Sequence, residues 1–326
     1  MAIDLHAHYV PPALAARLRE RAAAPRIEAT GSGERLVMPV GTLAFSPSFV
    51  DPALRIVSMA ETGIARQLLS LPGLFGIDSL PARESAPLLR LFNDDCAALC
   101  RRFPQRFAGL AALPLADMPA AVAELRRART DLGLLGAILP IDAFVSLREA
   151  QKMQPLFDAG NALGAHFFIH PGRRAGAGAP PPPASDNDMA RRALTVQAEV
   201  GEAMVTLLLS DFLEPYRNVR VQVANLGGTF AATVERMDHM VLQRTPGAAL
   251  PSSRARRVWV DCASLGPRAI EQAVAVYGAD RVLLGTDCPI FDTAHTLAGI
   301  REARLSEAER ELVLTANAAA LLERLS

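Results

Sequence analysis

Eight short apolar segments, separated by longer segments of mostly helical pattern, recur along the 326 residues of this chain. Their apolar character is nearly continuous, which is typical of strands buried on both faces, as in a parallel sheet. The predicted strands are residues 2–8, 64–71, 106–113, 134–140, 165–170, 219–225, 257–262 and 281–287. Strand–helix alternation repeated eight times predicts a single α/β domain over residues 1–326, a (β/α)8 barrel.

Segments with helical periodicity follow most of these strands. The predicted helices cover residues 84–102, 118–130, 147–163, 189–213, 230–242, 267–277 and 306–325. Ser306 and Glu309 have the spacing of a capping box at the start of the last, C-terminal helix. A doubly wound open sheet is the alternative architecture. Its usual glycine-rich turn is missing after the first strand, where the chain reads HAHYVPP.

Two segments depart from the strand–helix pattern. Residues 24–48 contain glycines and prolines among alternating residues, which predicts a small β excursion after the first strand. Residues 171–188, PGRRAGAGAPPPPASDND, lack helical periodicity and follow directly on His170. We predict a flexible surface loop here, and its place after a strand end leaves open a role as a lid.

Composition and charge exclude several classes of protein. Lys plus Arg and Asp plus Glu each number 34, so no net field favours nucleic acid or an anionic membrane. No apolar run reaches the roughly 18 residues of a membrane-spanning helix, and nothing resembles a signal peptide. The four cysteines form no C-x-x-C pair and are too few for a disulfide framework. We therefore expect a reduced, cytoplasmic protein with no membrane or nucleic-acid partner.

The first strand carries two histidines, His6 and His8, at alternate positions. Alternate side chains of a strand share a face, so both imidazoles are expected to project from its C-terminal end into the mouth of the barrel. Active sites of (β/α)8 barrels are built at that end. Such a pair is a natural beginning for a metal site, although histidines also occur in cores with their nitrogens satisfied.

Two further residues with metal-binding side chains end later strands. His170 ends the fifth strand, and Asp287 ends the eighth within GTDCP. Either residue alone is also explained as a loop or turn former. Together with His6 and His8 they offer three imidazoles and one carboxylate, which match the ligands of a catalytic Zn²⁺. The sequence therefore predicts a divalent metal site at the C-terminal end of the barrel.

An ordered series of motifs resembles the amidohydrolase superfamily. IDLHAHY opens the chain, DPALRIVSMAETGIARQLLSLPG covers residues 51–73, and FNDDCAALCRRFPQRFAGLAALPL covers 92–115. The series continues with FIHPG at 168–172, NLGGTF at 225–230, GTDCP at 285–289 and LTANAAALL at 314–322. Within the superfamily, the chain is similar to the metal-dependent decarboxylases of aminocarboxymuconate semialdehyde, 6-methylsalicylate and γ-resorcylate. Each motif alone is weak, whereas their order is specific.

The resemblance implies that His6, His8, His170 and Asp287 bind Zn²⁺, with Mn²⁺ as the alternative. It implies non-oxidative decarboxylation of a small planar carboxylic acid, in which Asp287 relays a proton to the carbon that loses CO₂. A metal-dependent hydrolase or hydratase acting on a lactone, amide or enol acid needs the same ligands and is the second candidate function.

Asn225 departs from the family pattern, in which a histidine precedes the glycine-rich turn after the sixth strand and acts as acid or base. An amide can orient water or substrate, but it does not exchange a proton near neutral pH as an imidazole does. Either Asp287 carries proton transfer alone, or another titratable group substitutes, or the chain is a catalytically weakened ligand-binding barrel. Candidate substitutes are His239, His295 and Asp292. We favour a retained metal and a modified reaction, in which Asn225 can orient water or substrate.

Arginine is the residue expected to bind a substrate carboxylate, because its guanidinium makes bidentate contacts. Arg55 lies in the DPALRI segment, which resembles the family segment with a substrate-binding arginine. Arg244 lies nineteen residues after Asn225, where some relatives place an arginine that reaches the neighbouring subunit, so we expect a homodimer. Tyr9, directly after the first strand, either contacts substrate at the barrel mouth or packs in the core.

Overall fold

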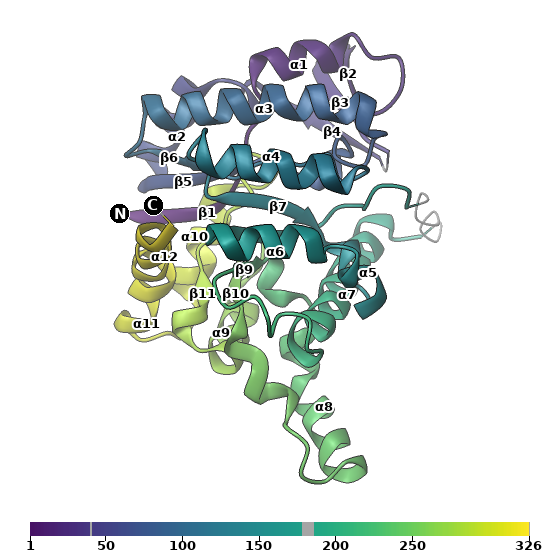
Figure 1. Cartoon of the computed structure of the whole chain (residues 1–326). Helices are drawn as coiled ribbons and strands as arrows, with labels where there is room; N and C mark the ends of the chain where they lie inside the picture. The colour runs from purple at the N-terminus through teal and green to yellow at the C-terminus, as the bar shows by residue number, and fades with distance from the viewer. Residues whose placement is uncertain (40, 178–185, 326) are drawn as a thin grey trace.

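The computed structural model describes residues 1–39, 41–177 and 186–325. Eight parallel strands form a ring, and helices pack around them (Figure 1). The ring strands are β1 Ala2–His8, β5 Ile64–Ser70, β6 Phe107–Gly109, β7 Gly136–Pro140, β8 His166–His170, β9 Arg220–Val223, β10 Trp259–Asp261 and β11 Val282–Leu283. Each strand lies inside one of the eight predicted segments, so the apolar runs located all of them.

Two parallel bridges close the ring. Strands β1, β5 and β6 pair in one sheet, and β7 to β11 pair in a second. Ala7 pairs with Cys288 beyond the end of β11, and Ala111 beyond β6 pairs with Ala137 of β7. The amide of Ala111 also donates to the carbonyl of Gly136 (2.8 Å). The predicted (β/α)8 barrel is therefore confirmed, with all strand C-termini at one end, its mouth.

Helices lie outside the ring; those at residues 52–62 and 293–302 were not predicted, and the others follow the predicted order. The helices are α2 Pro52–Thr62, α3 Ala82–Arg102, α4 Met118–Thr130, α5 Leu147–Gln151, α6 Gln154–Leu163, α7 Asp188–Leu209, α8 Phe230–Arg244, α9 Pro267–Tyr277 and α10 Thr293–Glu302. The prediction of one helix over residues 147–163 is wrong, because α5 and α6 divide it. Pro155 lies in the first turn of α6, and its ring would clash with a carbonyl if α5 continued through it. None of the described helices combines the length and apolar character needed to cross a membrane.

Residues 24–48 form the predicted β excursion. Strands β2 Arg26–Thr30, β3 Gly33–Val37 and β4 Thr42–Phe45 pair antiparallel, after the short helix α1 Pro12–Arg19. Phe45 stacks on Phe49 with ring centroids 5.3 Å apart, and Phe49 packs edge-on against Phe75 at 6.0 Å. Since Phe75 follows the C-terminal end of β5, these contacts anchor the excursion beside the barrel mouth.

The segment predicted as a loop, residues 171–188, is described only in part. Residues 178–185 lie outside the described residues, so the predicted lid stays a prediction. The described parts, 171–177 and 186–187, contain no helix or strand, and α7 begins at Asp188.

The C-terminal segment closes the end of the barrel opposite the mouth. The predicted capping box at Ser306 and Glu309 is confirmed, but the helix has three parts: α11 Glu307–Glu311, a π-helical turn Leu312–Ala316, and α12 Asn317–Leu325. Figure 1 shows α12 beside the N-terminus of the chain. Its apolar side chains join those inside the ring in one cluster, which includes Leu5, Leu68, Leu110, Ile138, Phe168, Leu283, Leu321, Leu322 and Leu325. We call this set the barrel-interior cluster.

Candidate metal centre

A β-bulge in β1 lies next to His6, on the strand whose alternation already puts His6 and His8 on one face. Between Asp4 and Ala7, two residues of β1 oppose one residue of β5. The ring of His6 packs against that of Phe168, a member of the barrel-interior cluster, with centroids 4.8 Å apart. Strict alternation would have placed Asp4 on this face as well, so the bulge is what separates Asp4 from the two histidines.

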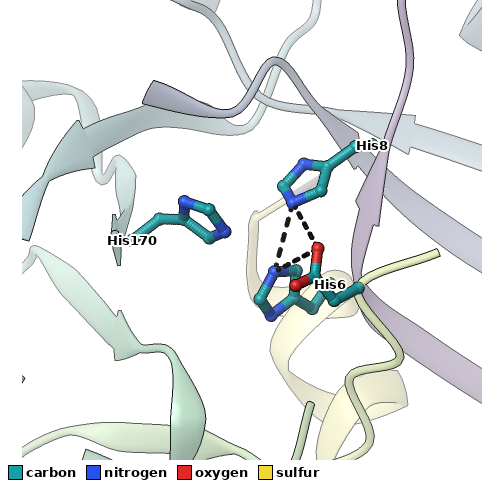
Figure 2. A group of neighbouring side chains, drawn as sticks. His6, His8 and His170 are labelled. Atoms are coloured by element: carbon teal, nitrogen blue, oxygen red, sulfur yellow. Dashed lines mark hydrogen bonds and ion pairs between the residues drawn. The ribbon is translucent and has the colours of Figure 1, made fainter. Parts of the chain in front are cut away.

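Two more strand ends complete the group. His170 is the last residue of β8, and Asp287 follows β11, where its amide donates to the carbonyl of His6 (2.7 Å). One potential ligand atom from each of His6, His8, His170 and Asp287 lies within 4.8 Å of the others, and all four residues are buried. Figure 2 shows the three imidazoles turned toward one another. The structure thus gathers all four predicted ligands at the barrel mouth, and we call them the four-residue cluster.

Hydrogen bonds at the far side of each imidazole fix its orientation. The acceptors for Nδ1 are Asp261 Oδ1 for His6 (2.9 Å), Ser70 Oγ for His8 (3.1 Å) and the Pro171 carbonyl for His170 (2.9 Å). A carboxylate or carbonyl can only accept, so Nδ1 carries the proton in His6 and His170. With Nδ1 turned outward, Nε2 faces the centre of the cluster and is the atom that would bind a metal ion.

The spacing of these atoms fits a divalent cation. Nε2 of His6 lies 3.2 Å from Nε2 of His8, and Asp287 Oδ1 lies 2.9 Å from the latter and 3.5 Å from the former. Tetrahedral ligands at about 2.0–2.1 Å from Zn²⁺ lie about 3.3 Å from one another. The carboxylate of Asp287 is buried beside the Nε2 atoms of His6 and His8, and a cation bound there would offset the cost of burying its charge.

Charge at the site also favours a cation. Burial lowers the pKa of His8 and of His170, so both are neutral. Burial opposes protonation of His6 too, but Asp261 and Asp287 outweigh it and raise its pKa to about 10. Burial acts to raise the pKa of Asp287, yet the imidazoles of His6 and His8 hold this pKa well below its usual range. Two carboxylates thus stabilise positive charge at the centre of the cluster.

Asn225 begins the turn that follows β9. Asn225 and Leu226 have left-handed backbone angles, with φ of 56° and 53°, a conformation that asparagine tolerates better than most residues. The amide of Ala224 donates to the carbonyl of Ile169 (3.0 Å), which places this turn beside the strand end that carries His170. The side chain of Asn225 is buried and makes no hydrogen bond within the described residues. Its orienting role stays a prediction.

Arg55 lies against the end of β1. It is only 3% exposed on α2, and its Nη2 donates to the carbonyls of His8 and Ser48 while Nη1 donates to Gln67 Oε1 (3.2 Å). Gln67 in turn donates to Asp4 Oδ2 (3.0 Å). The guanidinium is buried and has three protein acceptors, and its predicted contact with a substrate carboxylate stays a prediction. Arg55 fixes the end of β1 behind His8.

Tyr9 packs in the core, the second of its two alternatives. It is buried, and its hydroxyl donates to Asp95 Oδ1 on α3 (2.8 Å), so it faces the surrounding helices. The substrate contact considered for Tyr9 is not supported by this placement. Arg244 is exposed at the end of α8, which projects from the barrel in Figure 1.

The groups considered as substitutes for a histidine at position 225 lie on the surface. His239 is exposed on α8, and His295 is exposed on α10. Asp292 is exposed as well, and its side chain caps α10 by accepting from the amide of Ala294 (3.0 Å). None of the three is a buried group of the kind that lines the cluster.

Sequence reasoning missed Asp261, the acceptor for His6. It ends β10 in the segment RVWVDC and is fully buried. An acidic residue at the C-terminal end of a barrel strand was the available signal. Gly285 is required beside it, because a Cβ there would lie 2.7 Å from both Asp261 Oδ1 and the Cβ of His6.

Sequence relatives extend over most of the chain. A 2-amino-3-carboxymuconate-6-semialdehyde decarboxylase from Dictyostelium discoideum is 28% identical over 279 residues, which cover 82% of this chain and 75% of that protein. A γ-resorcylate decarboxylase from Rhodococcus jostii is 27% identical over 300 residues, which cover 83% of this chain and 87% of the relative.

A solved structure and a family model agree with these relatives. A dihydroxybenzoic acid decarboxylase from Polaromonas sp., solved with bound manganese and the inhibitor 2-nitroresorcinol, shares the fold with a TM-score of 0.71. It is 20% identical, over 99% of this chain and 96% of that chain. Residues 3–324 match the model of the amidohydrolase family. The chain therefore belongs to the amidohydrolase family.

Proposed function

We propose that the chain is a metal-dependent decarboxylase that releases CO₂ from a small planar carboxylic acid without oxidation. The observation that carries this proposal is the convergence of three Nε2 atoms and one carboxylate at the barrel mouth. The family membership and the decarboxylases among the sequence relatives support the reaction class.

The four-residue cluster is the proposed metal site. Its nitrogen-rich set of His6, His8, His170 and Asp287 favours Zn²⁺, and Mn²⁺, which the Polaromonas neighbour holds, is the alternative. A divalent ion bound there would polarise a substrate oxygen and stabilise negative charge that develops on it.

Asp287 is the proposed proton-transfer group. Its carboxylate can accept the proton of a hydroxyl group on the substrate ring and return it to the ring carbon that carries the carboxylate. The bond to that carboxylate then breaks, CO₂ leaves, and the electron pair stays on the ring. One proton taken from solvent restores the hydroxyl group, so the reaction consumes one proton for each CO₂ released.

Asn225 is proposed to orient the substrate. Its side chain is buried at the turn beside His170 and makes no hydrogen bond within the described residues. An amide can donate to one substrate oxygen and accept from a hydroxyl, but it cannot act as a base. This leaves Asp287 as the group that moves the proton.

We further propose that the enzyme is a homodimer in which Arg244 contributes to the partner's site. The exposed position of Arg244 at the end of α8 supports this, as do Met240 and Leu242, which are 40% and 58% exposed on the same helix. The cytoplasmic location also stays a proposal; the four cysteines are free thiols, as a reducing compartment would keep them.

Product analysis tests the proposed reaction. The enzyme, loaded with Zn²⁺ or Mn²⁺, would be screened against hydroxybenzoates and muconate semialdehydes, with CO₂ and the organic product measured together. We expect CO₂ release from at least one compound and its loss in His170→Ala. A ring-opened or hydrolysed acid formed without CO₂ would support the hydrolase alternative instead. No turnover of either kind by metal-loaded enzyme would contradict the proposal.

A further inference from the structure

A chain of buried polar side chains runs through the barrel interior to His6. His166 on β8 contacts Gln222 on β9, Gln222 contacts Asp261 on β10, and Asp261 accepts from His6. The first three of these residues are fully buried, so each unsatisfied group among them would be costly. These hydrogen bonds therefore link His6, a proposed metal ligand, to His166 and Gln222, which have no part in the proposed reaction.

The direction of every hydrogen bond in this chain is determined. Gln222 Nε2 donates to Asp261 Oδ2 (2.8 Å) and to the carbonyl of Leu5 (3.1 Å), both of which can only accept. Gln222 Oε1 must then accept from Nε2 of His166 (3.1 Å). Burial lowers the pKa of His166 to about 4, so its imidazole is neutral and has one N–H to donate.

Gln222 acts on His6 from two sides. Through Asp261 it fixes the carboxylate that holds Nδ1 of His6. Through the carbonyl of Leu5 it also holds the bulge of β1, since Leu5 immediately precedes His6. An apolar side chain at position 222 would release both contacts at once, because no other residue combines them among those described.

We propose that Gln222 is a positioning residue for the metal centre, which sets the direction of the His6 lone pair through Asp261 and Leu5. This inference rests on the proposed metal site. Asp261 contacts His6 directly, and loss of such a partner typically weakens metal binding about 10–100-fold; Gln222, one contact further away, should account for the lower end of that range, about tenfold. We expect a loss of that size for Gln222→Met, which keeps a side chain of similar length but removes both donors and the acceptor.

Asn93 offers a matched control. It is a fully buried amide on α3, remote in sequence from the cluster, that donates to the carbonyl of Ala112 (3.0 Å) and accepts from its amide (2.9 Å). Asn93→Leu should lower the stability of the fold, as Gln222→Met does, without changing metal affinity. Zn²⁺ affinity would be measured by competition with a chromophoric chelator, and the absorption spectrum of Co²⁺-loaded protein would report the ligand geometry.

The outcomes separate this inference from the proposed function. Wild-type protein that binds neither Zn²⁺ nor Co²⁺ would refute the metal site itself. Suppose that the wild type binds metal. The role of Gln222 would be overturned if Gln222→Met had a Zn²⁺ affinity within twofold of wild type and an unchanged Co²⁺ spectrum. It would also be overturned if Asn93→Leu lost as much Zn²⁺ affinity as Gln222→Met. If Gln222→Met does not fold, His166→Leu tests the same series of hydrogen bonds. It should weaken Zn²⁺ binding severalfold, and unchanged affinity there would also overturn the inference.

Discussion

Position 225 holds an amide in a turn where the backbone itself restricts the choice of residue. The left-handed conformation at Asn225 is one that asparagine adopts at small cost, so backbone geometry and side-chain function are compatible there. The amide can hold a substrate oxygen, so in the proposed reaction proton transfer comes from Asp287, whose ionised state the neighbouring imidazoles favour. Orientation and proton transfer are thus assigned to two different residues.

Replacement of Asn225 tests this division. Asn225→Ala should lower kcat roughly ten- to hundredfold through loss of orientation, with metal content unchanged. Asn225→His should instead introduce a titration near pH 6.5 into the pH profile of kcat, since an imidazole exchanges protons in that range. Steady-state kinetics between pH 5 and pH 9, together with elemental analysis, would measure both. Wild-type turnover in Asn225→Ala would exclude an orienting role.

The four-residue cluster was predictable at the residue scale because each member is a histidine or aspartate at the C-terminal end of a strand. His6, His8, His170 and Asp287 needed only strand positions and the alternation of side chains. Arg55 was not predictable in this way. One of its acceptors, the carbonyl of His8, lies 47 residues away in sequence, and no local pattern shows that a guanidinium will be buried.

Among the elements, α12 covers the end of the barrel opposite the mouth. Leu321 and Leu322 are almost fully buried against the barrel-interior cluster. Leu321→Ala should therefore destabilise the fold by about 2–5 kcal/mol. Denaturant unfolding would measure this, with the Glu323→Ala variant of an exposed residue on the same helix as a control. Metal affinity should not change, because α12 lies at the end of the barrel opposite the four-residue cluster. An equal loss of stability in both variants would contradict the proposed contribution of Leu321 to the core.

The loop after β5 carries a buried carboxyl group that should make stability depend on pH. Burial raises the pKa of Asp78 to about 7, with a further contribution from nearby Asp142, and Oδ1 of Asp78 has no hydrogen-bond partner among the described residues. The folded chain thus keeps this proton to about pH 7, whereas the unfolded chain releases it near pH 4. The contribution to stability is complete below about pH 4 and is lost as the pH rises through about 7.

Asp78→Asn isolates this effect. The neutral amide removes the cost of burying a charge, so the variant should have a higher Tm than the wild type at pH 8 and a similar Tm at pH 4. Thermal unfolding at the two pH values would show it, with the exposed Asp211→Asn as a control. A difference in Tm that is the same at both pH values would show that Asp78 does not titrate as described.

The positions of the ring strands followed from the sequence, whereas the bulge in β1 and the π-helical turn did not. Apolar runs located all eight ring strands, but the bulge in β1 depends on pairing with β5 and leaves no mark in the alternation of β1 itself. The break between α5 and α6 did have a signal, because Pro155 could not continue a helix. No local pattern predicted the π-helical turn Leu312–Ala316 before α12.

For the whole molecule, a dimer through α8 is the proposal with the clearest consequence. Leu242→Glu would place a charge on an exposed apolar side chain of this helix, and it should dissociate the dimer. Arg244→Ala should keep the dimer but raise KM for a carboxylate substrate. Sedimentation velocity of both variants and the wild type, beside steady-state kinetics, would separate the two effects. A wild-type enzyme that is active and monomeric at assay concentration would rule out a contribution from the partner subunit.

The central claim is that four residues at the barrel mouth hold one divalent metal ion. The most direct test is the metal content of the purified protein by elemental mass spectrometry, beside His6→Ala, which removes one ligand without changing the barrel strands. We predict about one Zn²⁺ or Mn²⁺ per wild-type chain and its loss from the variant. A wild-type protein that holds no metal, even after incubation with both ions, would contradict the claim.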